Sequence, residues 1–252
     1  MSVNDATNIA ISATSVPSVT HEILAVLDDV GYLHIPAFTE PNAEYQTRLY
    51  KLISALSTPL HVYRNHDYWK ELPADISRPR TRSGGIGLNS LHIDLVNLEN
   101  PPDIIAFYCV RGDPAGGGRT LACSLNDLQV PKEILDELER PIYKDGAAYD
   151  LDGVGNDCQP FAIYNPDSDW KWRWSGRILE TIKDQDESVD YEALLEFDRI
   201  LNNHAIGVEL QPGDVMLVNQ KTVLHGRLPM GSHQERWELS ERRLVIQAYG
   251  RR

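Results

Sequence analysis

The sequence predicts a mainly β protein with flanking helices, in which the strands form a β-sandwich or jelly roll. Two groups of short, apolar, strand-like segments lie at 103–124 and 205–250, on either side of a helix-rich passage. Short turns such as DPAGGG at 113–118 join neighbouring strands, which is typical of antiparallel sheets. The sequence has no GxGxxG or GxxxxGK motif after an early strand, so a parallel doubly wound sheet fits less well.

The N-terminal part is expected to be helical after a polar arm. Residues 1–19 lack the basic and apolar regions of a secretory signal and are predicted to form a flexible arm. Thr20 is a candidate cap for a helix that Gly31 ends, and the segment YLHIPAF follows as a short strand. A second helix is predicted over 41–58, because a tyrosine and three leucines recur there at helical spacing.

The other elements are predicted in chain order. Residues 60–87 are irregular and rich in aromatic, basic and glycine residues, which indicates either a plain connection or a loop over a pocket. The passages SLNDLQVPKEILDELER and SVDYEALLEFDRILNN favour helices. We therefore predict one domain over 20–252, with a helical and irregular insert around 125–204. The predicted strands are 103–110, 119–124, 205–210, 215–219 and 242–250.

Composition limits the class of partner. The chain has 252 residues, of which 42% are hydrophobic and 24% charged, as in ordinary soluble globular proteins. The formal net charge of −13 argues against nucleic acid or an anionic membrane as a partner, and no apolar run is long enough for a membrane helix. A small-molecule substrate fits better. Three cysteines without CxxC spacing predict a reduced, cytoplasmic protein, whereas the oligomeric state stays open.

A candidate metal site begins in the segment LNSLHIDLVN, residues 88–97. If this segment is a strand, His92 and Asp94 point to one face, and Ile93 and Leu95 to the other. Such a strand would have the core on one side and a polar pocket on the other. Taken alone, the pair of side chains also fits a partly buried ion pair.

A third ligand is available later in the chain. In QPGDVMLVNQKTVLHGRLP a tight turn leads into a buried strand, and His225 opens the next extended segment. Two histidines and one carboxylate leave three positions of a metal open, which is the pattern of non-haem Fe(II) oxygenases. Zinc hydrolases usually have HExxH or a third histidine, and neither is present here.

Four motifs, in the same order, resemble the core motifs of the Fe(II)/2-oxoglutarate-dependent dioxygenases. They are LHIDLVN, GGGRTLACSLNDL, PGDVMLVNQKTVLHGR and RRLVIQAYG, and they lie between residues 20 and 250. The similarity is greatest to the branch of taurine dioxygenase and clavaminate synthase. It implies a double-stranded β-helix (jelly roll, cupin-like) core and the cofactors Fe(II), 2-oxoglutarate and O2. The implied reaction is hydroxylation of an unactivated C–H bond with release of succinate and CO2; desaturation or cyclisation is also possible.

The resemblance also implies roles for single residues. His92, Asp94 and His225 match the metal ligands, and Thr120 matches the threonine that binds the far carboxylate of 2-oxoglutarate. An arginine after His225 should form a salt bridge with that carboxylate, because a guanidinium meets a carboxylate with two parallel hydrogen bonds. Arg227, two residues after His225, would share its face and could touch the cosubstrate or the substrate.

Arg242 and Arg243 compete for the salt bridge, with Arg236 a third candidate. Strand alternation favours Arg243, because the continuous apolar stripe formed by the other face belongs against the helices. Arg242 would then be a solvated charge at the start of a strand. The residues expected to face inward with Arg243 are Val245 and Gln247, and those expected to pack outward are Leu244, Ile246 and Ala248.

The substrate prediction rests on the family resemblance and on a few residues near the candidate ligands. Taurine dioxygenase holds its sulfonate with an arginine four residues after the cosubstrate arginine, and Gln247 stands at that position here, which disfavours a sulfonate. We expect an amino acid or an amino-acid-derived natural product. Asn89 and Ser90 are candidates to line the pocket, and Arg173 in DWKWRWSGR could pair with a carboxylate. Aromatic packing on an exterior helix is the alternative for that segment.

Other functions remain open from the residues alone. One is a cupin-like metalloprotein whose chemistry does not use 2-oxoglutarate, and another is a non-catalytic small-molecule binding protein. Thr120 and Arg243 discriminate between these functions, because only a 2-oxoglutarate enzyme needs that pair to hold a second carboxylate.

Overall fold

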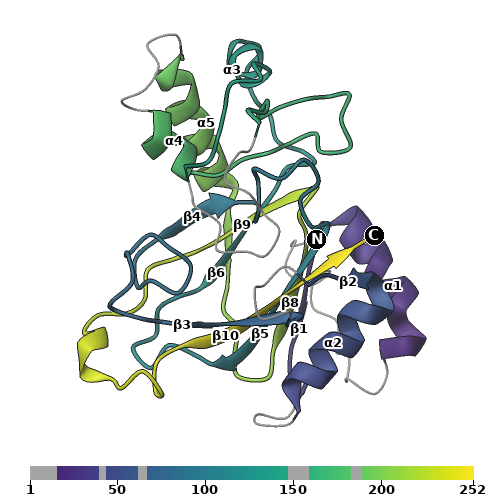
Figure 1. Cartoon of the computed structure of the whole chain (residues 1–252), viewed down its shortest axis with the longest axis vertical. Helices are drawn as coiled ribbons and strands as arrows, with labels where there is room; N and C mark the ends of the chain where they lie inside the picture. Colours follow the sequence, from purple (N-terminus) through teal and green to yellow (C-terminus); the bar gives the residue numbers. More distant parts are fainter. Residues whose placement is uncertain (1–15, 40–43, 62–66, 147–158, 183–188) are drawn as a thin grey trace.

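The computed structural model describes residues 16–39, 44–61, 67–146, 159–182 and 189–252. Within these ranges the protein is mainly β, with two antiparallel sheets flanked by a few helices (Figure 1). None of the helices described has the length and apolar character needed to cross a membrane.

The larger sheet has six strands in the order β1-β8-β5-β10-β2, and β3 also pairs with β10. All its pairings are antiparallel, and the strands β8, β5 and β10 at its centre are rich in Val, Ile, Leu and aromatic residues, which favour strands. The strands are β1 Tyr32–Ile35, β2 Thr58–Pro59, β3 Trp69–Pro73, β5 Ile104–Arg111, β8 Val215–Asn219 and β10 Leu244–Arg251.

The smaller sheet has four strands in the order β4-β9-β6-β7, again antiparallel. Its two central strands, β9 and β6, come from segments far apart in the sequence and lie side by side. The strands are β4 Asn89–His92, β6 Thr120–Ser124, β7 Ile206–Val208 and β9 Val223–Arg227.

Two N-terminal helices cover the outer face of the larger sheet (Figure 1). They are α1 Val16–Asp29 and α2 Tyr45–Leu56. Their apolar faces form one buried cluster with outward-facing residues of the sheet, among them Ile246 and Ala248 of β10. Gly31 ends the first helix with a φ of +88°, a conformation that favours glycine.

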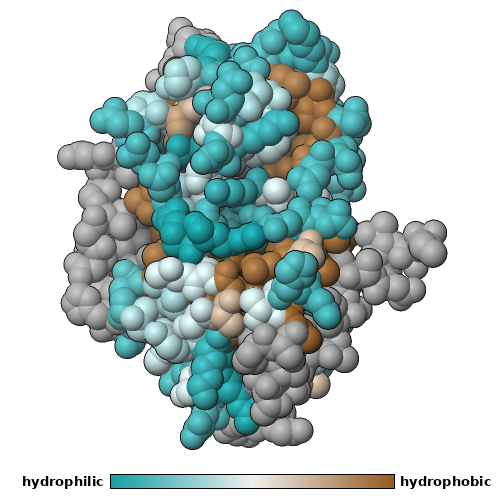
Figure 2. Space-filling view, turned by 90° about the vertical axis from the view of Figure 1, so that its right-hand side faces the viewer, coloured by the Kyte–Doolittle hydropathy of each residue, from teal (hydrophilic) through white to brown (hydrophobic). Residues whose placement is uncertain are grey.

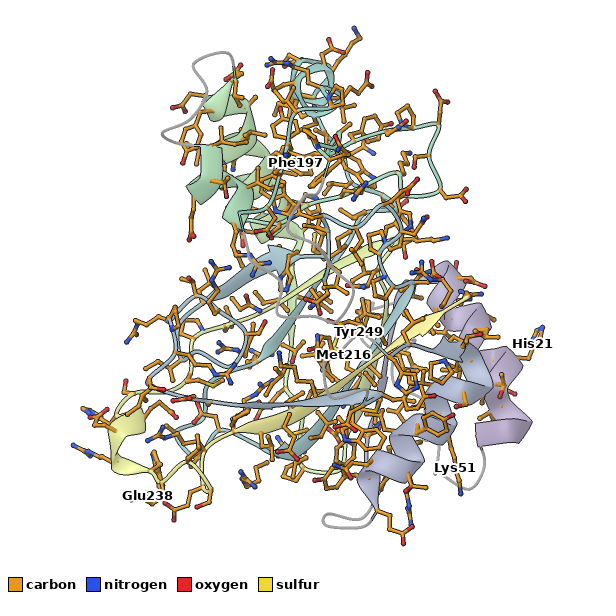
Figure 3. All side chains as sticks on the ribbon, in the orientation of Figure 1. His21, Lys51, Phe197, Met216, Glu238 and Tyr249 are labelled. Carbon is orange, nitrogen blue, oxygen red and sulfur yellow. The ribbon has the colours of Figure 1, made fainter. Side chains whose placement is uncertain are left out.

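The remaining helices lie beyond the smaller sheet, within the insert predicted around 125–204 (Figure 1). A second buried cluster joins them to β4, β6 and β9, and it includes Trp172, Trp174 and Phe197. The Phe197 side chain is labelled in this upper part of the molecule in Figure 3. The helices are α3 Lys132–Leu138, α4 Arg177–Ile182 and α5 Tyr191–His204, and a short 3₁₀ helix, η1 Gln234–Arg236, precedes β10.

A third buried cluster fills one end of the space between the two sheets. It combines Phe107, Met216 and Val245 of the larger sheet with Ala122 and Val223 of the smaller one. The polar pocket described below lies beside this cluster. Seen from the side of α1 and α2, hydrophilic residues alternate with apolar patches on the surface (Figure 2).

Most predicted elements are confirmed, but several boundaries differ, and β3 lies within the stretch 60–87 that was predicted to be irregular. The first helix begins at Val16 instead of Thr20, because a proline at position 17 is tolerated in a first turn, where no N–H donor is needed. Its start lies within the predicted arm, of which residues 1–15 are outside the described residues. The strand predicted over 88–97 ends at His92, and Asp94 lies in the turn that follows.

Candidate metal centre and cosubstrate pocket

The two candidate histidines lie on adjacent strands of the smaller sheet. His92 of β4 and His225 of β9 are directly opposite each other in the antiparallel register, so their side chains share one face. Their ring centroids are 4.5 Å apart, and both side chains are buried. The sheet backbone therefore fixes the first two candidate ligands.

Asp94 reaches the same place from a turn instead of a strand. The Ile93 N–H donates to the Trp174 carbonyl, so the insert pairs with the chain where β4 leaves the sheet. Leu95 then takes a positive φ of +59°, which turns the backbone sharply. Asp94 therefore shares a face with the histidines although the strand alternation expected there is absent.

The three side chains converge. Asp94 Oδ1 is 3.3 Å from His92 Nε2, and Asp94 Oδ2 is 3.5 Å from His225 Nε2. One potential ligand atom from each residue lies within 4.8 Å of the other two. Two imidazole nitrogens and one carboxylate oxygen with this spacing are a donor set that suits a divalent first-row transition metal.

The electrostatics favour the forms that bind metals. Burial raises the pKa of Asp94, but hydrogen bonds and charge interactions with His225 and His92 outweigh it and hold this pKa well below the usual value. Burial, together with the nearby His92, lowers the pKa of His225 despite the opposing effect of Asp94. An ionised carboxylate and a neutral imidazole are the states that ligate a metal, so the residues fit such an ion.

Neighbouring groups orient the candidate ligands. His92 Nδ1 is 2.7 Å from the Ser90 carbonyl oxygen, which sets the orientation of the ring. His225 Nδ1 has no hydrogen-bond partner among the residues described, and the ring packs against Phe107 at 5.1 Å between centroids. The Asp94 backbone N–H donates to Gln220 Oε1 at 2.6 Å.

The carboxylate of Asp94 receives two further hydrogen bonds. Gln247 Nε2 and the Tyr249 hydroxyl both donate to Oδ2. Gln220 and Tyr249 were not anticipated from the sequence. Alternation along β10, which placed Gln247 inside, would also have placed Tyr249 inside, whereas no local pattern marks Gln220.

One pocket contains both the candidate ligands and the candidate cosubstrate residues. The ligands line it together with apolar side chains such as Phe107, Met230 and Val245. Thr120, Arg227 and Arg243 line it as well, and Arg227 lies two residues after His225 on β9.

Arg243 faces into this pocket as strand alternation predicts. Val245 follows it in the inner cluster, while Ile246 and Ala248 pack against the helices outside. Burial lowers the pKa of Arg243, and this outweighs the opposing effect of the Asp113 carboxylate. Among the residues described, no carboxylate lies within 4.0 Å of the guanidinium and no hydrogen bond occupies it.

The two other candidates for the salt bridge, Arg242 and Arg236, have surroundings different from those of Arg243. Arg242 is buried, and its Nε donates to the carbonyls of Gln234 and Trp237, so the expectation of a solvated charge is wrong. Arg236 is exposed at the end of the 3₁₀ helix. Neither is among the residues that line the pocket.

Thr120 and Arg227 lie opposite each other on β6 and β9. Both are buried and line the pocket. The Arg227 guanidinium donates to the carbonyls of Gly85, Gly87 and Leu228 at 2.7–2.9 Å. Burial lowers its pKa to about 10, so it stays charged at neutral pH. Its hydrogen bonds hold the loop before β4 at the pocket.

The candidate substrate residues separate into two groups. Asn89 lines the pocket. The Ser90 side chain instead packs against Gly176, where an added Cβ would be 2.6 Å from Ser90 Oγ. Gln247 also lines the pocket but donates to Asp94, as described above.

The expected pocket role of Arg173 is wrong, because its guanidinium is used elsewhere. It donates to the carbonyls of Val96 and Leu98 and lies 4.4 Å from the Phe161 ring centroid. The flanking residues Trp172 and Trp174 are buried core residues, and their segment is not a helix. Arg173 therefore braces the turn that carries Asp94.

Comparison with known proteins identifies a matching family. The profile described as taurine catabolism dioxygenase TauD, TfdA family matches residues 6–241 of the chain. No curated protein matches the chain.

Solved structures share the fold at low sequence identity. Asparagine oxygenase in complex with Fe(II), 2S,3S-3-hydroxyasparagine and succinate has a TM-score of 0.69 and 14% identity, over 92% of this chain and 79% of that chain. A second asparagine oxygenase (AsnO) structure has a TM-score of 0.68 and 12% identity, over 98% and 93%. The non-heme iron oxygenase OrfP in complex with Fe and α-ketoglutaric acid has a TM-score of 0.68 and 14% identity, over 96% and 94%.

Proposed function

Because the chain belongs to the TauD, TfdA dioxygenase family, we propose that His92, Asp94 and His225 bind the Fe(II) of a 2-oxoglutarate-dependent oxygenase. The family resemblance inferred from the sequence is thereby confirmed, and with it the enzyme class and the cofactors Fe(II), 2-oxoglutarate and O2. The residues that hold each cofactor are the proposal.

We propose further that β3 to β10 form a double-stranded β-helix. The support is the strand order: the chain passes from β3 in the larger sheet to β4 in the smaller one, then to β5, and then to β6. After the β6–β7 pair in the smaller sheet, β8, β9 and β10 again alternate between the sheets. Such alternation, with every pairing antiparallel, is the topology of a jelly roll.

Arg243 is the residue that supports a binding site for 2-oxoglutarate in this pocket. Its guanidinium lies in the same pocket as the ligand triad and has no carboxylate partner among the residues described. A buried, unpaired cation is costly unless a ligand brings the opposite charge. We propose that Arg243 binds the far carboxylate of 2-oxoglutarate with two parallel hydrogen bonds, and that the Thr120 hydroxyl donates to the same carboxylate.

The chemistry is shared between the cofactors and the chain. When bound, iron and 2-oxoglutarate couple the oxidative decarboxylation of 2-oxoglutarate by O2 to oxygen insertion into a C–H bond, giving succinate, CO2 and an alcohol. Asp94 supplies the negative charge that offsets part of the charge of the ion. Arg243 fixes the cosubstrate, and Phe107, Met230 and Val245 keep water from that part of the pocket. No separate protein acid or base is needed.

The substrate class is proposed by analogy with two structural neighbours. The neighbouring asparagine oxygenase is in complex with 3-hydroxyasparagine, and OrfP with L-Arg in another structure. We propose an amino acid or an amino-acid-derived natural product as the substrate, with hydroxylation as the reaction. Asn89 lines the pocket, and we propose that it contacts the substrate. We propose that the enzyme acts in the cytoplasm, in the biosynthesis of a natural product.

The single observation that carries the proposal is the presence of the ligand triad and the unpaired Arg243 in one pocket. It is tested by anaerobic titration of the apo-protein, first with Fe(II) and then with 2-oxoglutarate. We expect a weak visible charge-transfer band on addition of 2-oxoglutarate, lost in His225→Ala. Iron binding without that band would favour a cupin-like metalloprotein with other chemistry. If the protein binds no iron, His92 and Asp94 form an ion pair and not a metal site.

The substrate is tested separately. Succinate release from 2-oxoglutarate is measured with a panel of free amino acids and with carrier-bound aminoacyl groups. Release that one substrate stimulates, with a product 16 mass units heavier for the added oxygen atom, would support hydroxylation. A product two mass units lighter than the substrate would indicate desaturation or cyclisation instead.

A further inference from the structure

The candidate carboxylate ligand is held by side chains from the opposite sheet. Asp94 follows β4 of the smaller sheet, whereas its partners Gln247 and Tyr249 lie on β10 of the larger one. Gln247 Nε2 donates to Asp94 Oδ2, and the Tyr249 hydroxyl donates to the same oxygen at 2.9 Å. Figure 3 labels Tyr249 near the centre of the molecule, and its side chain belongs to the buried cluster that both sheets share. Both donors are buried.

The two donors have little freedom to move. They are two residues apart on one strand, so alternation points both into the space between the sheets. β10 is paired along its length with β5 on one side and with β3 on the other; Gln247, for example, lies opposite Phe107 and Lys70. A strand paired on both sides is among the most rigid supports that a fold offers.

The two carboxylate oxygens of Asp94 are therefore not equivalent. Oδ2 accepts hydrogen bonds from Gln247 and Tyr249 and also lies 3.5 Å from His225 Nε2. Oδ1 has no such donors among the residues described and lies 3.3 Å from His92 Nε2. Oδ1 is the oxygen left with lone pairs for a cation.

We propose that Gln247 and Tyr249 are positioning residues that make Asp94 a one-oxygen ligand of the metal. This inference rests on the proposed function. A carboxylate that used both oxygens would occupy one of the three coordination positions that two histidines and one carboxylate otherwise leave open. Those positions are needed by the two cosubstrate oxygens and by O2. Holding Oδ2 on β10 therefore preserves the coordination sites that the reaction requires.

The proposal gives Gln247 a role different from substrate binding. It stands four residues after Arg243, where the sequence suggested contact with the substrate. The structure directs its amide to Asp94, so the cosubstrate cation directly before β10 and the support of the carboxylate ligand on β10 line the same pocket. One strand would then set the positions of both cofactors relative to each other.

The experiment measures metal affinity in the absence of turnover. Apo-protein is titrated anaerobically with Co(II), which reports its coordination number in its visible spectrum, and with Fe(II) by calorimetry. The variants are Tyr249→Phe, Gln247→Met and the double variant. Loss of an outer-shell hydrogen bond typically weakens metal binding on the order of 10- to 100-fold, and we expect each single variant to fall in this range.

Tyr108→Phe is the matched control. It removes a buried tyrosine hydroxyl from β5 in the same sheet, where the hydroxyl is 2.6 Å from Thr39 Oγ1 and the side chain packs toward the helices. We expect its metal affinity to equal that of the wild type. Thermal unfolding of each apo-protein shows whether a variant is folded. Tyr249→Phe is the smallest change, so it keeps the test valid if Gln247→Met fails to fold.

The outcomes separate this inference from the proposed function. If the wild type binds one metal ion and the β10 variants bind it equally tightly with an unchanged Co(II) spectrum, the positioning role is overturned while the proposed function stands. Equal weakening in Tyr108→Phe would also overturn it, because the effect would then belong to the fold. If the wild type binds no metal, both fail. Weaker binding with an altered Co(II) spectrum in the β10 variants alone supports the inference.

Discussion

In one part of the pocket the Asp94 carboxylate accepts hydrogen bonds from Gln247 and Tyr249 of β10, whereas in another part the Arg243 guanidinium has no carboxylate partner among the residues described. We call these the ligand end and the arginine end. The protein prepares the ligand end in advance, because a resident ion binds best to ligands that are already oriented. It leaves the arginine end without a partner, because a cosubstrate consumed in each cycle must bring its own charge.

The largest effect is expected from removal of a ligand. His225→Ala should abolish binding of Fe(II) and all succinate formation, because two remaining protein ligands hold a divalent ion too weakly. Anaerobic calorimetry measures the affinity, and succinate release measures the activity. A variant that kept wild-type affinity would show that the metal lies elsewhere. His204→Ala is the control, since this histidine lies at the end of α5 and its Nδ1 contacts only the backbone of the same helix.

Arg243→Met is expected to have a large effect on the binding of 2-oxoglutarate and none on the binding of the metal. Loss of a charge-assisted hydrogen bond costs about 1.5–3 kcal/mol, which raises the KM for 2-oxoglutarate about 10- to 100-fold. Metal affinity without 2-oxoglutarate should be unchanged, which separates the two ends. Arg243→Lys should lie between the wild type and Arg243→Met, because lysine keeps the charge but loses the planar pair of donors. Arg119→Met, which removes an exposed cation outside the pocket, is the matched control.

The comparison also shows which parts of the site sequence reasoning could reach. Alternation along β10 correctly placed Arg243 inward, and the ligand histidines came from a local motif and its distant partner. The motif identified Asp94, although the strand alternation that was expected to orient this side chain is absent. The expected strand stops at His92, because the insert pairs with the chain there through Trp174, and no local pattern indicates such a contact.

Residues whose role depends on distant partners were the ones misjudged. Arg173 has the composition of a substrate-binding cation, but its partners are two carbonyls more than 70 positions earlier in the chain. Arg242 looked solvated, yet the short 3₁₀ helix before β10 buries it. Periodicity predicts which face a side chain occupies, whereas the partner on that face depends on the tertiary fold.

Arg227 tests whether a second cation at the arginine end serves the cosubstrate or the loop. Arg227→Met leaves the carbonyls of Gly85, Gly87 and Leu228 without their donor, at a cost of about 1–3 kcal/mol in the free energy of unfolding. We expect a lower Tm, measured by calorimetry, and a smaller increase in the KM for 2-oxoglutarate than Arg243→Met gives. A larger increase, with an unchanged Tm, would make Arg227 the main cosubstrate cation.

The smallest effect is expected from Thr120→Val, which keeps the shape of the side chain and removes one hydroxyl. A hydrogen bond from an uncharged hydroxyl to a carboxylate that Arg243 already neutralises contributes about 0.5–1.5 kcal/mol, so the KM for 2-oxoglutarate should rise about 2- to 10-fold while kcat changes little. Thr120 is buried on β6 beside Arg227, and a buried valine suits a strand, so the Tm should hold. If the KM is unchanged, Arg243 alone holds the far carboxylate. Combining Thr120→Val with Arg243→Lys tests whether the two residues bind the same carboxylate. Two groups that bind one carboxylate give non-additive effects, whereas independent groups give additive effects.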